Sequence, residues 1–72
     1  MAFYFVAWGG HIRAAKADTP RAACLDCYGL ATPEMVVEKL PKNPKYMSAK
    51  AKADITNRLN QQAGLKARLK AH

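Results

Sequence analysis

Two runs of strand-forming residues open the chain, and only two glycines separate them. The first run covers residues 3–8 and the second covers residues 11–16, with Gly9-Gly10 between them. Because glycine adopts positive φ without strain, this pattern predicts a β-hairpin with a two-residue turn. A turn of this length sets the register, which gives three predicted cross-strand pairs: Trp8–His11, Val6–Arg13 and Tyr4–Ala15.

The two faces of this hairpin differ in character, because side chains alternate across a strand. One face is apolar and is predicted to point into the core: Phe3, Phe5, Ala7, Ile12 and Ala14. The other, which we call the outer hairpin face, is mixed: Tyr4, Val6, Trp8, His11, Arg13 and Ala15.

A short helix is predicted after the hairpin. Thr19 is suited to accept a backbone N–H as the N-cap, and Pro20 suits the first helical position, where its missing N–H is no loss. The helix should continue over residues 21–28 and end at Gly29, a natural left-handed stop. We expect its inward residues to be Ala22, Ala23 and Leu25, with one of the two cysteines.

Residues 34–40 fit two structures. They follow a second Thr-Pro pair, contain adjacent β-branched residues and end before Pro41, so they suit a third strand or a helix of two turns. We favour the strand, because a lone two-stranded hairpin is marginally stable in water.

A long helix is predicted from Ala49 onward, with Ser48 as its cap. Gly64 is expected to end or bend it. Its apolar stripe includes three residues: Ala51, Ile55 and Leu59.

These elements predict one small α+β domain. Residues 1–47 would form a ββαβ core of hairpin, short helix and third strand, and residues 48–72 a basic C-terminal helical segment that packs on it or extends from it. Seven residues are expected in the core: Phe3, Phe5, Ile12, Leu25, Val37, Ile55 and Leu59. The element order is similar in outline to many small ββαβ domains, including phage-encoded proteins that bind and inhibit host nucleic-acid machinery. No diagnostic residue accompanies this resemblance.

The size of the chain argues against catalysis. With 72 residues it has no room for a cleft between two lobes, and its five carboxylates show no paired arrangement. We therefore expect no enzymatic activity, cofactor or small-molecule substrate. The apolar run at residues 2–8 is too short to cross a membrane and follows no basic residue, so we expect a cytoplasmic protein without a membrane partner.

The net charge of +7 is concentrated in the second half of the chain. Residues 1–38 contain three basic and four acidic residues, a net charge of −1, whereas residues 39–72 contain nine basic residues and one acidic residue, a net charge of +8. This asymmetry favours a polyanionic partner, either nucleic acid or the acidic surface of a nucleic-acid-processing complex, bound as a regulator or inhibitor would bind it. The alternative is a solvated helix whose charge only maintains solubility.

Two groups of side chains are predicted to bind this partner. The outer hairpin face combines rings with cationic groups, as surfaces that stack bases and bind phosphates do: Tyr4, Trp8, His11 and Arg13. The basic half would contact phosphates through six side chains: Lys50, Lys52, Arg58, Lys66, Arg68 and Lys70.

Three alternatives stay open at this point. Tyr4 and Trp8, or Leu65 and Leu69, could anchor a protein partner without nucleic-acid contact. If the C-terminal helix covered the hairpin face, Trp8 would belong to the core. Residues 21–40 could also form a helix-turn-helix, although the second helix would present acidic residues to the phosphates.

Cys24 and Cys27 form a single CxxC pair. A structural zinc site needs four ligands, and the only histidines are His11 and His72. The pair is therefore a weak metal candidate, and we expect two half-buried thiols.

Overall fold

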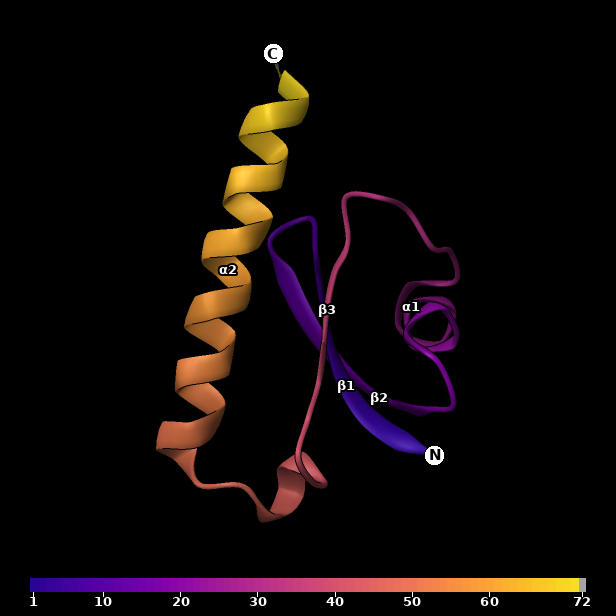
Figure 1. Cartoon of the computed structure of the whole chain (residues 1–72), viewed down its shortest axis with the longest axis vertical. Helices are drawn as coiled ribbons and strands as arrows, with labels where there is room; N and C mark the ends of the chain where they lie inside the picture. Colours follow the sequence, from indigo (N-terminus) through magenta and orange to yellow (C-terminus); the bar gives the residue numbers. More distant parts are fainter. Residues whose placement is uncertain (72) are drawn as a thin grey trace.

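The computed structural model describes the backbone of residues 1–71 and the side chains of residues 1–66. A three-stranded antiparallel sheet lies between two helices, so that the molecule has three layers (Figure 1). The strands are β1 (Ala2–Trp8), β2 (His11–Ala17) and β3 (Val36–Lys39). The helices are α1 (Pro20–Tyr28) and α2 (Ala49–Ala71), with a 3-10 turn η1 (Pro44–Tyr46) between β3 and α2. The predicted α+β class and the order ββαβα are confirmed.

The hairpin has the predicted register. Trp8 pairs with His11 across Gly9 and Gly10, whose φ angles are 59° and 81°. β3 is the third strand, and it pairs with the free edge of β1, so β1 lies in the middle of the sheet in the order β2-β1-β3. Because both neighbours are antiparallel to β1, β2 and β3 are parallel to each other, and α1 connects them by crossing over one face.

α1 covers the face of the sheet that was predicted to be the outer one. Its boundaries are as expected: the Thr19 hydroxyl accepts the N–H of Ala22 at 3.1 Å, and Gly29 ends the helix with φ of 75°. Small side chains of α1 pack against the larger ones of the strands, and this first core cluster has eight buried residues: Tyr4, Val6, Ala15, Ala17, Ala23, Cys24, Cys27 and Met35.

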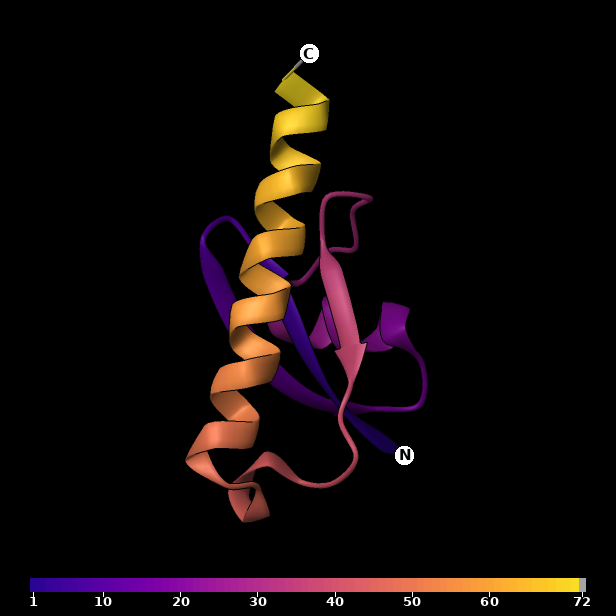
Figure 2. The same cartoon turned by 60° about the vertical axis from the view of Figure 1, so that its left-hand side comes forward.

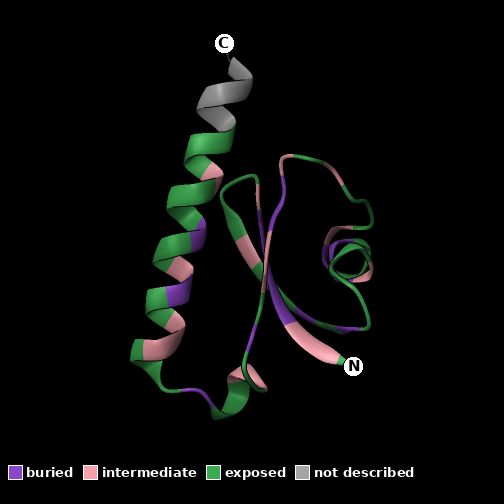
Figure 3. Ribbon diagram, viewed as in Figure 1, coloured by how far each residue is buried: buried purple, intermediate pink, exposed green. Residues whose placement is uncertain are grey.

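α2 covers the opposite face, as Figure 2 shows from a second direction. Seven buried residues form this second cluster: Phe5, Ala7, Val36, Leu40, Met47, Ile55 and Leu59. The side of α2 that faces the sheet holds its buried residues, whereas the opposite side is exposed (Figure 3). Phe3 and Ile12 are partly buried against the same cluster.

The prediction of Leu25 in the core is wrong, because this residue is 43% exposed. The strand face beneath α1 carries bulky side chains such as Tyr4 and Val6, which leave room for small ones on the helix. Ala23 and the two cysteines therefore point inward, and Leu25 points away. Val37 is only partly buried, and it lies on the α1 side of the sheet, apart from Ile55 and Leu59.

The favoured third strand is confirmed, one alternative is excluded, and one expectation needs correction. Residues 36–39 form a strand, so a helix-turn-helix is excluded, since no second helix follows α1 before residue 44. α2 also continues through Gly64 to Ala71, so that glycine does not end the helix. Packing of Ile55 and Leu59 against the sheet stabilises α2 by more than the unfavourable propensity of one glycine, which is about 1 kcal/mol.

Candidate functional site

The outer hairpin face is not an open platform. Tyr4 is 6% exposed beneath α1, and Trp8 is half-buried in the same cluster. His11 and Arg13 remain exposed at the edge strand β2. The structure thus separates the four predicted binding residues into two rings that pack internally and two exposed polar groups.

Arg13 attaches β2 to the end of α1. Its Nη1 donates to the carbonyl oxygen of Cys27 at 2.9 Å, one of the last carbonyls of the helix, which lack intrahelical partners. The guanidinium also lies 5.1 Å from the centre of the Tyr28 ring. Both contacts are internal, so this cation stabilises the packing of α1 on the sheet.

Tyr28 is the centre of this arrangement, and the sequence analysis did not single it out. Its hydroxyl lies 3.1 Å from the carbonyl oxygens of Val6 and His11, and its single proton is shared between them. Its ring meets that of Trp8 edge to face, with centres 5.4 Å apart. Burial raises the pKa of Tyr28, an effect that nearby Arg13 partly offsets. Helix position alone would have marked this residue, because it shares a side of α1 with Cys24.

Two cations of α2 that were predicted to bind phosphates also have internal partners. Arg58 forms a bidentate ion pair with Glu38 of β3, with Nε 2.9 Å from Oε1. This hydrogen bond and the carboxylate charge raise the pKa of Arg58. Lys66 Nζ donates to the carbonyl oxygens of Pro33 and Met35 at 3.2 and 3.1 Å. Both residues thus attach α2 to β3 and to the turn before it.

The remaining predicted cations differ in availability. Lys50 is paired with Asp54 at 3.6 Å, but both side chains are largely exposed, at 89% and 62%. Lys52 is half-buried, and its side chain has no hydrogen bond or ion pair within the described part of the chain. Arg68, Lys70, Leu69 and His72 lie outside the residues whose side chains are described.

A basic segment lies where β3 ends and α2 begins, and the sequence analysis selected only two of its lysines, Lys50 and Lys52. We call residues 39–52 the lysine segment: it contains five lysines, and the sequence has no acidic residue from position 39 to 53. Lys39, Lys42 and Lys45 are all exposed. η1 and the first turn of α2 occupy the same end of the molecule (Figure 1), so lysines from both lie at this end. The run of lysines in a proline-containing stretch was the signal available in the sequence.

Tyr46 stands within the lysine segment and is 67% exposed. The Nζ of Lys45 lies 5.9 Å from the centre of its ring. This pair resembles Arg13 and Tyr28 in residue types, but it is exposed. A ring next to several cations can stack a base while the cations meet its phosphates.

The start of α2 adds positive potential to the lysine segment. The Ser48 hydroxyl accepts the N–H of Ala51 at 3.1 Å and so caps the helix. The first turn has no acidic residue, although acidic groups are favoured there by the helix dipole. Lys50 and Lys52 occupy this turn instead. Each positive charge there interacts unfavourably with the helix dipole, by about a few tenths of a kcal/mol. The same lysines and the dipole together favour the binding of an anion.

The cysteines form no metal site with other described residues. Both thiols are free and buried, and no three His, Cys, Asp or Glu side chains within the described residues are grouped as ligands would be. Burial raises the pKa of both thiols, and the charge of Asp26 raises that of Cys27 further. Both cysteines are thus buried against the sheet, whereas the sequence analysis expected them to be half-buried.

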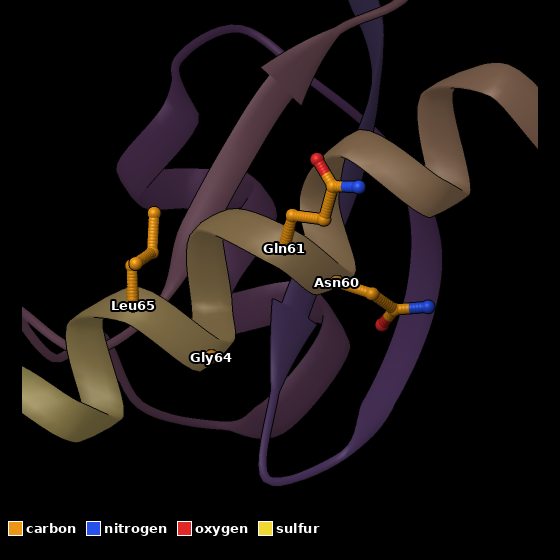
Figure 4. A pocket seen from close by; sticks show the side chains of 4 residues that line it. All are labelled: Asn60, Gln61, Gly64 and Leu65. Carbon is orange, nitrogen blue, oxygen red and sulfur yellow. The ribbon is translucent and has the colours of Figure 1, made fainter.

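A depression of about 400 Å³ lies on α2 itself (Figure 4). Its lining comes from one helix and carries no ionisable group: Asn60, Gln61, Gly64 and Leu65. Leu65 is 57% exposed, so the depression offers one apolar contact and two carboxamides. These groups can contact a partner but supply no acid, base or nucleophile.

Comparison with protein families finds no matching family model, and no similar curated protein or solved structure was found. Among the described residues, no helix combines the length and the apolar character needed to cross a membrane.

Proposed function

We propose that this protein binds a polyanion without catalysis, and that the polyanion is nucleic acid held through its phosphates by the lysine segment. The observation that carries the proposal is the surface position of Lys39, Lys42 and Lys45 next to the N-terminus of α2, whose first turn has no acidic residue. Each lysine that neutralises a phosphate releases counterions, which makes such binding favourable and dependent on salt.

The segment has the charge that such binding requires. Arg58 and Lys66 hold α2 in place, and Arg13 holds α1, so these three cations are engaged within the fold. The lysines between residues 39 and 52 have only the exposed Lys50–Asp54 pair as an internal contact to a carboxylate within the described residues. An exposed pair of this kind contributes little, and a phosphate can replace the carboxylate.

The test is fluorescence anisotropy with labelled random oligonucleotides of about 20 nucleotides, at about 50 and 200 mM salt. The variant is Lys42→Gln with Lys45→Gln. Its matched control is Lys16→Gln with Arg21→Gln, which removes the same charge from two exposed residues of the other half. We expect the first variant to bind about tenfold more weakly and its log–log salt slope to fall by about 0.7 for each phosphate of a single strand that is no longer neutralised.

We expect the control to bind less than about threefold more weakly, since it changes only the long-range field. Equal decreases in the two variants would show that net charge alone attracts the oligonucleotide and would contradict the assignment to the lysine segment. Absence of binding even at about 50 mM salt would reject nucleic acid as the partner.

A protein partner is the second candidate, and the exposure of Leu65 beside the carboxamides of the α2 depression favours it. Tyr4 and Trp8 are poor anchors for such a partner, because α1 covers them. If this candidate holds, Leu65→Gln should weaken complex formation more than Lys42→Gln does, as measured with the purified partner after nuclease treatment.

A further inference from the structure

We propose that Tyr46 is a base-stacking residue and that the lysine segment therefore prefers single-stranded nucleic acid to duplex. This inference rests on the proposed function, because it names the class of nucleic acid that the same segment takes. It is based on the exposure of the Tyr46 ring, which differs from that of the five other aromatic residues.

Tyr46 is the one aromatic residue outside the core clusters. The sequence contains six aromatic residues, and the other five belong to or pack against those clusters: Phe3, Tyr4, Phe5, Trp8 and Tyr28. Tyr46 is 67% exposed and no hydrogen bond of its hydroxyl is found among the described residues. Five of the six rings therefore contribute to the core, and Tyr46 is the ring whose face is open to a partner.

The backbone holds this ring in a defined place. Buried residues lie before and after the turn η1 that carries Tyr46, with Leu40 4% and Met47 7% exposed. Within it, Asn43 accepts the backbone N–H of Lys45 on its side-chain oxygen and that of Tyr46 on its carbonyl oxygen, each at 2.9 Å. Met47 N–H then donates to the carbonyl of Pro44 at 3.2 Å. The turn is ordered before any ligand arrives, so little conformational entropy is lost on binding.

A cation lies close enough to the Tyr46 ring to bind the phosphate of a nucleotide whose base stacks on that ring. Lys45 lies near one side of the ring, and its long stem allows the ammonium group to move from the ring to a phosphate. A base stacked on the ring would keep its own phosphate within reach of these lysines. In a duplex the bases are paired and stacked on each other, so their faces are closed to Tyr46, and the lysines alone would contribute.

The test compares Tyr46→Ala and Tyr46→Phe in anisotropy titrations with a labelled single strand and with a closed hairpin duplex that has no free single-stranded end. We expect Tyr46→Ala to lose about tenfold in affinity for the single strand and less than about twofold for the duplex. Tyr46→Phe should retain single-strand affinity, because it keeps the ring. Leu30→Ala, which truncates another exposed side chain, is the matched control and should change neither affinity.

The outcomes separate this inference from the function on which it rests. Unchanged single-strand affinity in Tyr46→Ala, together with weaker binding by the Lys42/Lys45 double variant, would overturn the stacking role alone. Equal decreases on single strand and duplex would overturn it too, because stacking acts on unpaired bases. No binding by the unaltered protein would overturn both proposals. Thermal unfolding of each variant checks that the fold is intact.

Discussion

Among the described residues, two pairs of a cation and a tyrosine look alike in composition and differ in surroundings. In one, the guanidinium of Arg13 lies 5.1 Å from the Tyr28 ring, and backbone carbonyls accept hydrogen bonds from both side chains. In the other, Lys45 lies 5.9 Å from the exposed ring of Tyr46, and neither side chain bonds to the rest of the described structure. The first pair joins a helix to a sheet, and the second faces solvent.

This difference shows that residue type does not decide whether a cation and an aromatic ring are engaged within the fold or remain exposed. A ring and a cation beside unsatisfied carbonyls stabilise the fold, because buried acceptors need donors. The side chains of Lys45 and Tyr46, on the surface turn η1, make no hydrogen bond or ion pair within the described residues and remain available. The availability of internal partners is therefore the criterion that separates the two.

The largest expected effect on stability comes from truncating Tyr28, and truncating Tyr46 provides the contrast. Tyr28→Ala removes the ring that contacts Trp8 and the hydroxyl that bonds to the strand carbonyls, so we expect a decrease of about 2–3 kcal/mol in the free energy of unfolding. Tyr46→Ala should change it by less than about 0.5 kcal/mol, because its side chain is exposed. Urea unfolding followed by circular dichroism measures both. Similar decreases in the two variants would contradict the assignment of Tyr28 to the packed interior and of Tyr46 to the surface.

Tyr28→Phe isolates the hydroxyl. The ring packing stays, but the proton shared by two carbonyl oxygens is removed, and a hydrogen bond of this kind contributes about 1 kcal/mol. We expect a decrease of this size in urea unfolding, smaller than that of Tyr28→Ala. Tyr4→Phe is the control ring substitution, since no hydrogen bond of the Tyr4 hydroxyl is found within the described residues. An unchanged unfolding midpoint in Tyr28→Phe would show that the hydroxyl serves no internal bond.

Glu38→Gln examines a third cation, Arg58, whose partner is a side chain at the surface. We expect a smaller decrease in the urea midpoint than for Tyr28→Phe, because solvent screens exposed ion pairs. The difference from the unaltered protein should diminish at about 1 M salt, where the Debye length is about 3 Å. A decrease that salt leaves unchanged would show that the contact is not mainly electrostatic.

The smallest effect is a pH dependence of the α1 side of the sheet. Burial raises the pKa of Cys24, Cys27 and Tyr28 in the folded state, so the folded protein retains protons that the unfolded chain releases. Stability should then be constant through neutral pH and decrease as pH rises above about 8.5, where unfolded thiols ionise. Urea midpoints between pH 7 and about 10 test this sign. A double Cys→Ala variant should show a shallower decrease.

Much of the local structure was available from the residues alone. Gly9-Gly10 required a tight turn, Thr19-Pro20 and Gly29 marked both ends of α1, and Pro41 limited β3 to the residues before it. These signals are local, because glycine, proline and hydroxyl side chains act on the backbone within a few residues. The register of the hairpin therefore needed no tertiary information. Residues 34–40 also suited a helix, and the choice of a strand there relied on the stability of the whole sheet.

Tertiary structure decided which faces are covered, and with them the candidate site. Alternation along β1 assigns Tyr4 and Phe5 to opposite faces, but only the placement of α1 and α2 shows that both faces are buried. Likewise, the positive charge of residues 39–72 follows from composition, whereas Arg58 and Lys66 are engaged because β3 and its preceding turn lie beside α2. Local backbone chemistry acts over a few residues, but burial and pairing depend on segments that are distant in sequence. For this reason only the folded chain separates the engaged Arg58 and Lys66 from the exposed Tyr46 and the lysines around it.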